Sequence, residues 1–458
     1  MLLTRHLINP DIKFIDVSDI GDQEYNYNDL CKLIDAYKNL LQSYGCQPGQ
    51  RAIIGMPARI EQTAIVFACA ELAISIAIVD YYRIDNWAES SYVDPKTKLL
   101  LPIDFFITEN PRQSEVGPKY KLFDQICNQT ISLRIANLDY THNPTILATE
   151  DSEIIRCTSS GTTGTPKVIK HSHKFISNLI VRNSRMFAGK AGLNRNLQHG
   201  SSFATYFLPV LASPGITHFY NFRSQHTKEI CLYKLDHLMI PYPYLIDEFF
   251  ESAVIKNSNL NIYTLSYIQQ KWVDYVRQGK AKNIISIFGS NETSGPIFLN
   301  EIQPIDDFNP KRFTKVDDFY SLSFDQDDVI TVSLPYYDSV NICTNDRFNY
   351  QDGYYYHQGR SDLIRINGLA VDLLGYNEFA KNLLDCDLIY DTIEHTIYLA
   401  VWSQDRSEEQ IQIIAKHLDT TTNGLHTISK WSFLEQSDFI RGVKIDHELL
   451  RDYFRNYV

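Results

Sequence analysis

The chain has 458 residues, of which 44% are hydrophobic, 21% are charged and 12% are aromatic. This balance is typical of a soluble globular protein and argues against disorder. The formal net charge is −12, so the chain as a whole does not attract nucleic acid or anionic membranes. Any anionic ligand must therefore be bound by local features.

The N-terminus lacks the apolar segment of a signal peptide. The longest mostly apolar run, 65–79, is interrupted by Glu71 and is too short to cross a bilayer. The eight cysteines are scattered without a C-x-x-C pair, which favours reduced thiols. We expect a cytoplasmic protein without a membrane span.

The hydrophobic pattern first predicts alternating helices and strands, over 27–44, 51–56, 59–72 and 74–79. Gly45 is the expected end of the first helix. This alternation is typical of βαβ units, so a mainly parallel sheet layered with helices is expected in an α/β protein.

From Phe313 onward short strands dominate, and two are predicted over 329–334 and 341–344. Asp352-Gly353 between aromatic runs predicts a β-hairpin. After Arg360 the pattern favours a smaller α+β segment, which would be joined to the preceding part by a short hinge.

A loop rich in glycine and hydroxyl residues, T-S-S-G-T-T-G-T-P-K over 158–167, is the most informative stretch. Glycines let the main chain approach an anion closely, hydroxyls add donors or metal contacts, and Lys167 adds positive charge. A solvated turn is the alternative, and the order of a Walker A loop is absent. The expected phosphate-binding residues are Thr158, Ser159, Ser160, Gly161, Thr162, Thr163, Gly164 and Lys167.

The order of this loop resembles the signature loop of the acyl-adenylate-forming enzymes, which include acyl-CoA synthetases, luciferases and peptide-synthetase adenylation domains. His171-Ser172-His173 resembles the S-H that follows the loop in that family. Further matching segments follow in family order over nearly the whole chain.

The segment 288–292, F-G-S-N-E, resembles the aromatic-Gly-x-Thr-Glu motif of the family. The resemblance implies that Phe288 lies near adenine, that Gly289, Ser290 and Asn291 line the nucleotide, and that Glu292 is catalytic and helps hold Mg²⁺. A carboxylate suits Mg²⁺ beside phosphates. Asn291 replaces the usual threonine, and by itself the segment could be a simple turn after a strand.

Thr162 of the glycine-threonine loop is the second expected metal contact.

Thr344-Asn345-Asp346 is similar to the family motif T-G-D, in which the aspartate accepts hydrogen bonds from both ribose hydroxyls. Asn345 stands in place of the glycine, in an expected left-handed turn at the end of a strand.

The segment 359–368, G-R-S-D-L-I-R-I-N-G, resembles the hinge motif G-R-x-D-D-x-I-K-x-x-G. The resemblance implies that Arg360 is catalytic and contacts the nucleotide, and that Asp362 is the hinge. One residue of the family pattern is missing after Asp362, and Arg365 replaces the usual lysine.

The segment 442–446, G-V-K-I-D, looks like the terminal G-K motif of the family. By that resemblance Lys444 is the catalytic lysine, whose charge would let a carboxylate approach the α-phosphate. The preceding proline and hydroxyl residues of the family are absent, and Val443 separates the glycine from the lysine.

The resemblance implies a large N-terminal domain, residues 1–359, of mixed parallel sheets layered with helices plus a β-rich subdomain. A small mobile α+β C-terminal lid, residues 360–458, would carry the catalytic lysine. The implied cofactors are ATP and Mg²⁺, with coenzyme A as a possible acceptor. The acceptor would otherwise be a separate carrier protein acting in trans.

The residues 154–228 contain no Asp or Glu but several Lys and Arg. The ammonium of an α-amino acid bound there would lack a counter-ion, which is costly. We therefore favour a fatty, aryl or other plain carboxylate, and His199-Gly200 resembles the H-G near the acyl pocket in that branch. A solvated basic face is the alternative.

Three other functions stay open. Amino-acid adenylation, or acyl transfer to an amine, would use the same first step. A degenerate member would bind nucleotide without catalysis, which the altered motifs favour. A structural protein would leave the ordered motifs unexplained.

Overall fold

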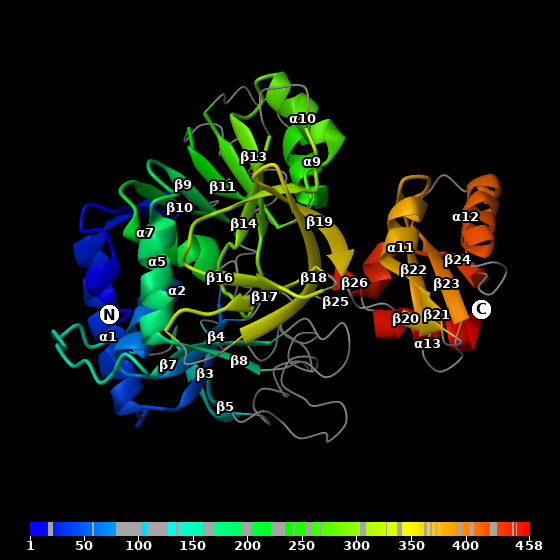
Figure 1. Ribbon diagram of the computed structural model, residues 1–458. Helices are drawn as coiled ribbons and strands as arrows, with labels where there is room; N and C mark the ends of the chain where they lie inside the picture. Colours follow the sequence, from blue (N-terminus) through cyan, green and yellow to red (C-terminus); the bar gives the residue numbers. More distant parts are fainter. Residues whose placement is uncertain are drawn as a thin grey trace. The chain divides into compact units, whose positions relative to one another are not determined.

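The computed structural model describes residues 1–16, 22–56, 59–78, 103–108, 127–133, 137–158, 168–194, 203–220, 234–240, 243–252, 259–265, 267–302, 308–326, 328–336, 341–360, 364–366, 369–371, 373–391, 396–402, 407–421, 428–441, 444–445 and 447–458. These residues form two compact units (Figure 1). The first comprises 1–321, 333–342 and 352–355, and the second comprises 322–332, 343–351 and 356–458.

One sheet of the first unit has the strand order β6-β5-β3-β4-β7-β8. Its neighbours are parallel, except that β7 and β8 are antiparallel. The strands are β3 (Arg51–Gly55), β4 (Ser75–Ile78), β5 (Ile103–Thr108), β6 (Cys127–Ser132), β7 (Glu153–Thr158) and β8 (Val168–Ser172). The expected parallel βαβ arrangement of the N-terminal part is confirmed by the pairing of β3 with β4.

Helices α1 (Tyr27–Ser43) and α2 (Ile60–Glu71) pack on each other in this unit. Asn26 caps α1: its side chain accepts from the main-chain N–H of Asp29, and the Asp29 carboxylate accepts from the N–H of Asn26. Gly45, at φ 77°, follows the helix in the left-handed conformation that favours glycine. The helix therefore begins and ends close to its predicted bounds.

The second sheet of this unit has the order β2-β1-β10-β9-β11-β12-β13-β14-β15. Its central pairs, from β1 through β13, are parallel, while β2, β14 and β15 join antiparallel. The strands are β1 (Lys13–Asp16), β2 (Gln23–Asn26), β9 (Ala191–Asn194), β10 (Ile216–Tyr220), β11 (His237–Met239), β12 (Asn261–Thr264), β13 (Asn283–Phe288), β14 (Phe298–Glu301) and β15 (Arg312–Lys315).

Further helices accompany these strands in the first unit (Figure 1). They are η1 (Arg5–Leu7), α5 (His173–Ser184), the π-helix η2 (Phe203–Phe207), α7 (Leu208–Ala212), α9 (Pro243–Ser252) and α10 (Gln270–Arg277). In α5, Phe175, Ile176 and Leu179 are buried, so one face of this helix belongs to the core.

Strands β16 (Ser321–Phe324), β17 (Val329–Ser333), β18 (Asn341–Gln351) and β19 (Tyr354–Arg360) follow one another in sheet order and lie largely in the second unit. The hairpin between β18 and β19 is confirmed. Asp352 and Gly353 both have positive φ, 52° and 85°, as a two-residue type I′ turn requires.

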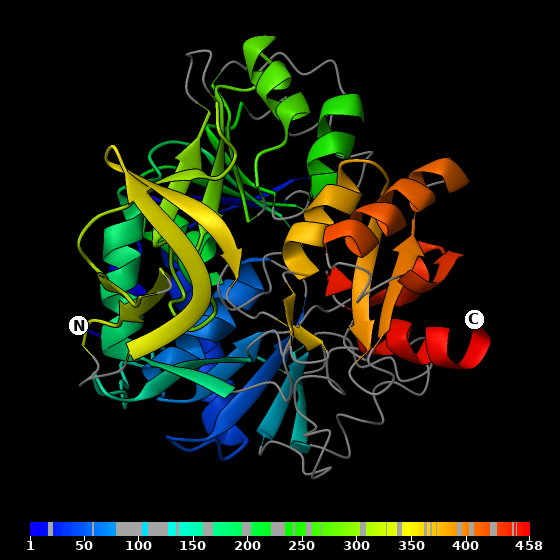
Figure 2. The ribbon, with the colours of Figure 1, turned by 45° about the vertical axis from the view of Figure 1, so that its right-hand side comes forward.

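The C-terminal part of the second unit has its own core around a sheet of order β22-β23-β24 (Figure 2). Alternate residues of β23 point to opposite faces: Leu399 packs in the cluster that α11 and α12 cover, and Tyr398 stacks on Phe454 of α13. The elements are β20 (Ile364–Ile366), β21 (Leu369–Val371), α11 (Leu373–Lys381), β22 (Cys386–Asp391), β23 (Thr396–Val401), α12 (Glu408–Thr421), β24 (Ile428–Phe433), η4 (Gln436–Phe439), β25 (Ile440–Arg441), β26 (Lys444–Ile445) and α13 (His447–Tyr457).

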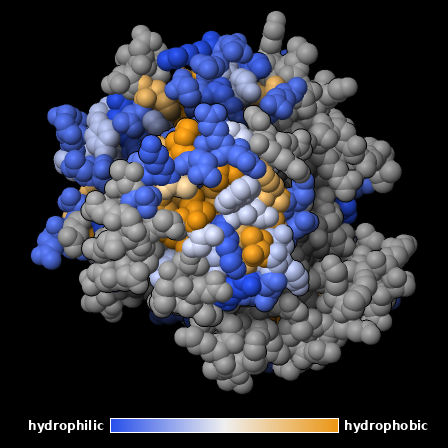
Figure 3. Space-filling view, turned by 90° about the vertical axis from the view of Figure 1, so that its right-hand side faces the viewer, coloured by the Kyte–Doolittle hydropathy of each residue, from blue (hydrophilic) through white to orange (hydrophobic). Residues whose placement is uncertain are grey.

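The predicted α/β fold class is confirmed by these mixed sheets and their helices. The domain boundary at residue 360 stays a prediction. In the described part of the chain, no helix has both the length and the apolarity needed to cross a membrane. The face in Figure 3 is largely hydrophilic where residues are coloured, with some orange apolar residues at the surface.

Candidate active site

The glycine-threonine loop lies between two paired strands, β7 and β8. Thr158 is the last residue of β7 and pairs with Val168, the first residue of β8. The residues between them, 159–167, lie outside the described part of the chain. The phosphate contacts expected of Ser159, Ser160, Gly161, Thr162, Thr163, Gly164 and Lys167 therefore stay predictions, while both ends of the loop have a defined position.

The predicted magnesium ligand lies on a tight turn after β13, which we call the Glu292 turn (residues 289–296). Phe288 ends the strand, half-buried, with its ring against Phe298 and Phe313 at centroid distances of 5.9 and 6.0 Å. Glu292 is also half-buried. The strand thus brings an aromatic ring and a carboxylate to one end of the sheet, and the roles expected of both residues stay predictions.

Hydrogen bonds within the turn fix its main chain. Thr293 Oγ1 accepts from the N–H of Ser290 at 3.0 Å, and the N–H of Ser294 donates to the Ser290 carbonyl at 2.9 Å. A Cβ at Gly289 would approach the Gly295 carbonyl oxygen to 2.4 Å, so only glycine fits there. Gly289 is therefore required by the close approach of two main-chain segments of the turn.

His171 of β8 joins the glycine-threonine hairpin to the Glu292 turn. Its Nε2 lies 3.0 Å from the carbonyl oxygen of Asn291, a residue 120 positions away in sequence. The ring is 1% exposed and stacks on Phe175 at a centroid distance of 4.9 Å. Burial lowers the pKa of His171 to about 4, so the imidazole is neutral and its Nε2–H is the donor.

The other two residues of the predicted H-S-H segment have structural roles. The Ser172 hydroxyl caps α5 by accepting from the N–H of Phe175 at 3.3 Å. His173 is fully buried, and its Nδ1 accepts from the N–H of Leu3 at 3.1 Å.

The basic run after the loop is not a uniform solvated or substrate-facing surface. Arg182 Nε binds the Asp317 carboxylate at 2.7 Å, and its guanidinium lies over the rings of Phe319 and Tyr320. Lys170 lies 3.8 Å from Glu153. Acidic residues from outside 154–228 therefore neutralise part of the run, which the sequence segment by itself did not indicate.

Asp346 lies in the second unit, within β18, and is 8% exposed. Its carboxylate Oδ1 is 3.1 Å from His357 Nε2, and its N–H donates to Thr344 Oγ1 at 3.1 Å. The predicted left-handed turn at Asn345 is wrong: this residue continues the strand and does not have positive φ. The Thr344 hydroxyl, which also donates to the Ile330 carbonyl at 3.2 Å, holds the segment in the strand.

The remaining predicted residues belong to the second unit or lie outside the described residues. Arg360 is the last residue of β19, and Lys444 is the first of β26, where its main chain pairs with Arg441. Asp362, His199 and Gly200 lie outside the described residues.

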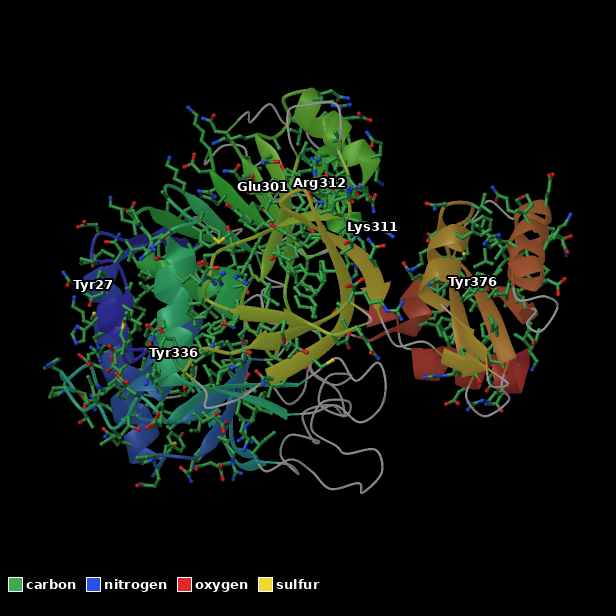
Figure 4. The ribbon with its side chains drawn as sticks, in the orientation of Figure 1. Tyr27, Glu301, Lys311, Arg312, Tyr336 and Tyr376 are labelled. Atoms are coloured by element: carbon green, nitrogen blue, oxygen red, sulfur yellow. The ribbon has the colours of Figure 1, made fainter. Side chains whose placement is uncertain are left out.

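A small cavity lies elsewhere in the first unit, on β14 and β15. It has a volume of about 130 Å³ and is lined by Leu299, Asn300, Glu301, Arg312, Thr314 and Tyr354. Figure 4 labels Glu301 and Arg312 on this side of the unit. Ligand pockets usually have about 300 to 1,000 Å³, so this cavity is too small for a nucleotide.

Comparison with known proteins adds independent information. Residues 9–212 match the sequence model of the family of AMP-binding enzymes. No curated protein matches the chain.

Solved structures with the same fold span almost the whole chain. O-succinylbenzoate coenzyme A synthetase (MenE) from Bacillus subtilis in complex with AMP is 14% identical, with a TM-score of 0.76 over 98% of this chain and 96% of that one. ATP-bound MatB from Rhodopseudomonas palustris is 13% identical, with a TM-score of 0.75 over 100% and 99%. McyG A-PCP complexed with phenylalanyl-adenylate is 14% identical, with a TM-score of 0.69 over 100% and 96%.

At this identity the structures establish the fold, and the family match over the N-terminal part agrees with the ordered motifs. Residues 9–212 therefore match the family of AMP-binding enzymes, and the chain as a whole has the fold of these solved structures.

Proposed function

We propose that this protein uses ATP to activate a carboxylic acid, forming acyl-AMP and pyrophosphate, and then transfers the acyl group to a thiol. The observation that carries the proposal is the contact between His171 and Asn291. It joins the two segments that resemble phosphate-binding and magnesium-binding motifs, although they are far apart in sequence. Together with the family match, it supports a nucleotide site in the first unit.

The chemistry of the described residues fits Mg·ATP. Mg²⁺ bound to phosphates needs only one or two protein carboxylates, and Glu292 offers one on a turn with a fixed main chain. We propose Glu292 and Thr162 as the magnesium contacts. When bound, the ion would neutralise charge on the phosphates.

In the first step a carboxylate oxygen of the acid would attack the α-phosphorus of ATP, and the bond to the bridging oxygen of the β-phosphate would break. Asp346 would accept hydrogen bonds from the ribose hydroxyls, and Arg360 would contact the nucleotide. Lys444 would lower the repulsion between the two anions. Positioning and charge neutralisation would supply most of the rate enhancement.

In the second step a thiol would attack the acyl carbonyl, and AMP would leave. The thiol would come from coenzyme A or from the phosphopantetheine of a separate carrier protein. We propose that residues 360–458 act as the lid and that Asp362 is its hinge, so that Lys444 is exchanged for the thiol between the steps.

The acid is proposed to be a plain carboxylate, as in the acyl- or aryl-acid ligase branch. An amino acid is the second candidate, for two reasons. An adenylation domain captured with phenylalanyl-adenylate has the same fold. In addition, Arg182 is neutralised by Asp317, which weakens the argument from uncompensated positive charge.

The test is pyrophosphate release from ATP and Mg²⁺ across a panel of fatty, aryl, dicarboxylic and amino acids, with and without coenzyme A. We expect release with at least one plain acid, and a thioester product only when the thiol is present. The Asp346→Asn variant serves as the control and should release at least about tenfold less pyrophosphate at limiting ATP. Pyrophosphate release with amino acids and with no plain acid would favour the second candidate. No pyrophosphate release with any acid of the panel would contradict the proposal.

A further inference from the structure

The main chain of the Glu292 turn is held by donors from four separate segments of the first unit. The carbonyl oxygens that they bind are those of Asn291, Thr293, Ser294 and Pro296, which stand on both sides of Glu292. His171 Nε2 donates to Asn291 at 3.0 Å, and Tyr320 Oη donates to Thr293 at 2.8 Å. Thr205 Oγ1 donates to Ser294 at 3.2 Å, and Arg182 Nη1 donates to Pro296 at 2.9 Å.

Three of these donors, His171, Thr205 and Tyr320, are buried, and Arg182 is partly buried. Tyr320 is 1% exposed, and burial raises its pKa above the ordinary range, so the phenol keeps its proton and donates. Arg182 is oriented by Asp317 and by the rings of Phe319 and Tyr320. The Tyr320 and Arg182 donors of the turn are thus held in place by their surroundings.

The segment that they hold is itself conformationally demanding. Ser294 is fully buried with φ at 49°, in the left-handed region that few side chains adopt. A Cβ at Gly295 would meet Leu179 at 2.6 Å and the Tyr320 hydroxyl at 2.8 Å. A buried residue in such a conformation persists only when its surroundings impose it, and strained segments of this kind are common at functional sites.

We propose that His171, Arg182 and Tyr320 are positioning residues that fix the Glu292 carboxylate for Mg·ATP through the main chain of its turn. The inference rests on the proposed function, and it assigns a role to three residues that lie outside the recognised motifs or at their edges. None of them needs to touch the nucleotide. A carboxylate held within a fraction of an ångström binds a metal better than one on a loose turn, because less order has to be imposed on binding.

The first experiment measures ATP binding by calorimetry without any carboxylic acid, so that no turnover occurs, once with Mg²⁺ and once with EDTA. In Tyr320→Phe and His171→Leu we expect the gain in affinity that Mg²⁺ brings to fall about five- to twentyfold, with affinity in EDTA nearly unchanged. His171→Gln, whose amide can donate from the same place, should recover most of the loss.

Tyr263→Phe is the matched control, because it also removes a buried tyrosine hydroxyl of the first unit. That hydroxyl contacts His237 at 3.0 Å and is not bonded to the Glu292 turn. Thermal unfolding of each variant shows whether it is folded at the temperature of the titration. An equal loss of affinity in Mg²⁺ and in EDTA, or an equal effect of Tyr263→Phe, would mean that the donors only support folding.

A double-mutant cycle with Glu292→Gln then asks whether Tyr320 acts through Glu292. If it does, Tyr320→Phe has no further effect on the magnesium dependence once Glu292 is changed, and additive effects would overturn the inference. If the parent protein binds no ATP in either condition, the proposed function itself fails. If the parent binds Mg·ATP and Tyr320→Phe shows the same gain in affinity from Mg²⁺, only the positioning role is refuted.

Discussion

His173 is a buried histidine whose neutral form the fold requires. Its Nδ1 accepts a main-chain hydrogen bond from Leu3, and its Nε2 has no hydrogen-bond partner among the described residues. Burial lowers the pKa of His173 to about 4, with a further contribution from the amino group of Met1. Protonation would therefore remove the acceptor at Nδ1 and place a charge in the core.

This histidine should make the protein less stable in mild acid. As the pH falls below about 6.5, the unfolded chain takes up the proton first, so the free energy of unfolding falls between about pH 6.5 and 4, by up to about 3 kcal/mol. His173→Asn keeps an acceptor and does not titrate. In urea denaturation, the free energy of unfolding should fall less for His173→Asn than for the parent between pH 7.5 and 5. Between pH 7.5 and 8.5 it should change with pH equally in both proteins. Parallel curves below pH 6.5 would contradict the prediction.

Ala73 has φ at 56°, a left-handed conformation that costs alanine about 1 kcal/mol or more and costs glycine little. It lies two residues after Glu71, the last residue of α2. We expect Ala73→Gly to raise the free energy of unfolding by about 0.5 kcal/mol, whereas Ala70→Gly inside α2 should lower it by about 1 kcal/mol. Equal destabilisation of the two variants in urea would show that the backbone of Ala73 is not strained.

At the scale of elements, a buried ionic cluster holds α1 and α2 to the N-terminal segment. Glu71 of α2 accepts from Arg5 at 2.9 and 2.8 Å and from Lys38 of α1 at 2.8 Å, and the Lys38 side chain is 0% exposed. Burial by itself would raise the pKa of Glu71, but the hydrogen bonds from Arg5 and Lys38 outweigh it and lower that pKa. The ionised carboxylate is thus part of the packing between these helices.

Removing this charge should be costly, because the buried Lys38 would lose its carboxylate partner and Arg5 would keep only Asp35. We expect Glu71→Gln to lower the free energy of unfolding by about 3 to 5 kcal/mol in urea denaturation. Asp318→Asn, which alters an exposed ion pair with Lys315, is the control and should change stability little. A small effect of Glu71→Gln would mean that water reaches the cluster.

At the scale of the whole molecule, the proposed residues are distributed over two compact units. The Glu292 turn and the ends of the glycine-threonine loop belong to the first, and Asp346 and Lys444 belong to the second. In the proposed two-step reaction the roles of the units would be separate, because Lys444 would be needed for adenylation and not once acyl-AMP is supplied.

Lys444→Ala tests this division. We expect pyrophosphate release to fall by at least about a hundredfold, because a cation beside the reacting phosphate is lost, while thioester formation from presynthesised acyl-AMP keeps much of its rate. Lys430→Ala, a change of another lysine in the second unit, serves as the comparison. Equal losses in both half-reactions would contradict separate roles, and no turnover in the parent would favour a nucleotide-binding protein without catalysis.

The sequence predicted much of this fold because its local signals are strong. The helix over 27–44 carries a capping residue, a periodic apolar face and a terminal glycine, and Asp352-Gly353 has the conformational freedom that a tight hairpin needs. The Thr344 segment was misjudged, because a side-chain hydrogen bond to another strand keeps it extended where the motif suggested a turn.

By itself, the sequence determined the resemblance to AMP-binding enzymes, the alternation of elements and the residues expected to carry the chemistry, since these depend on short motifs and on periodicity along the chain. Only the tertiary structure decided which residues hold the Glu292 turn and which acids neutralise the basic run. His171 and Asn291 are 120 residues apart, and Arg182 and Asp317 are 135 apart. Such pairs leave no local signal, because their contact energy depends on how separate elements pack and not on neighbouring residues.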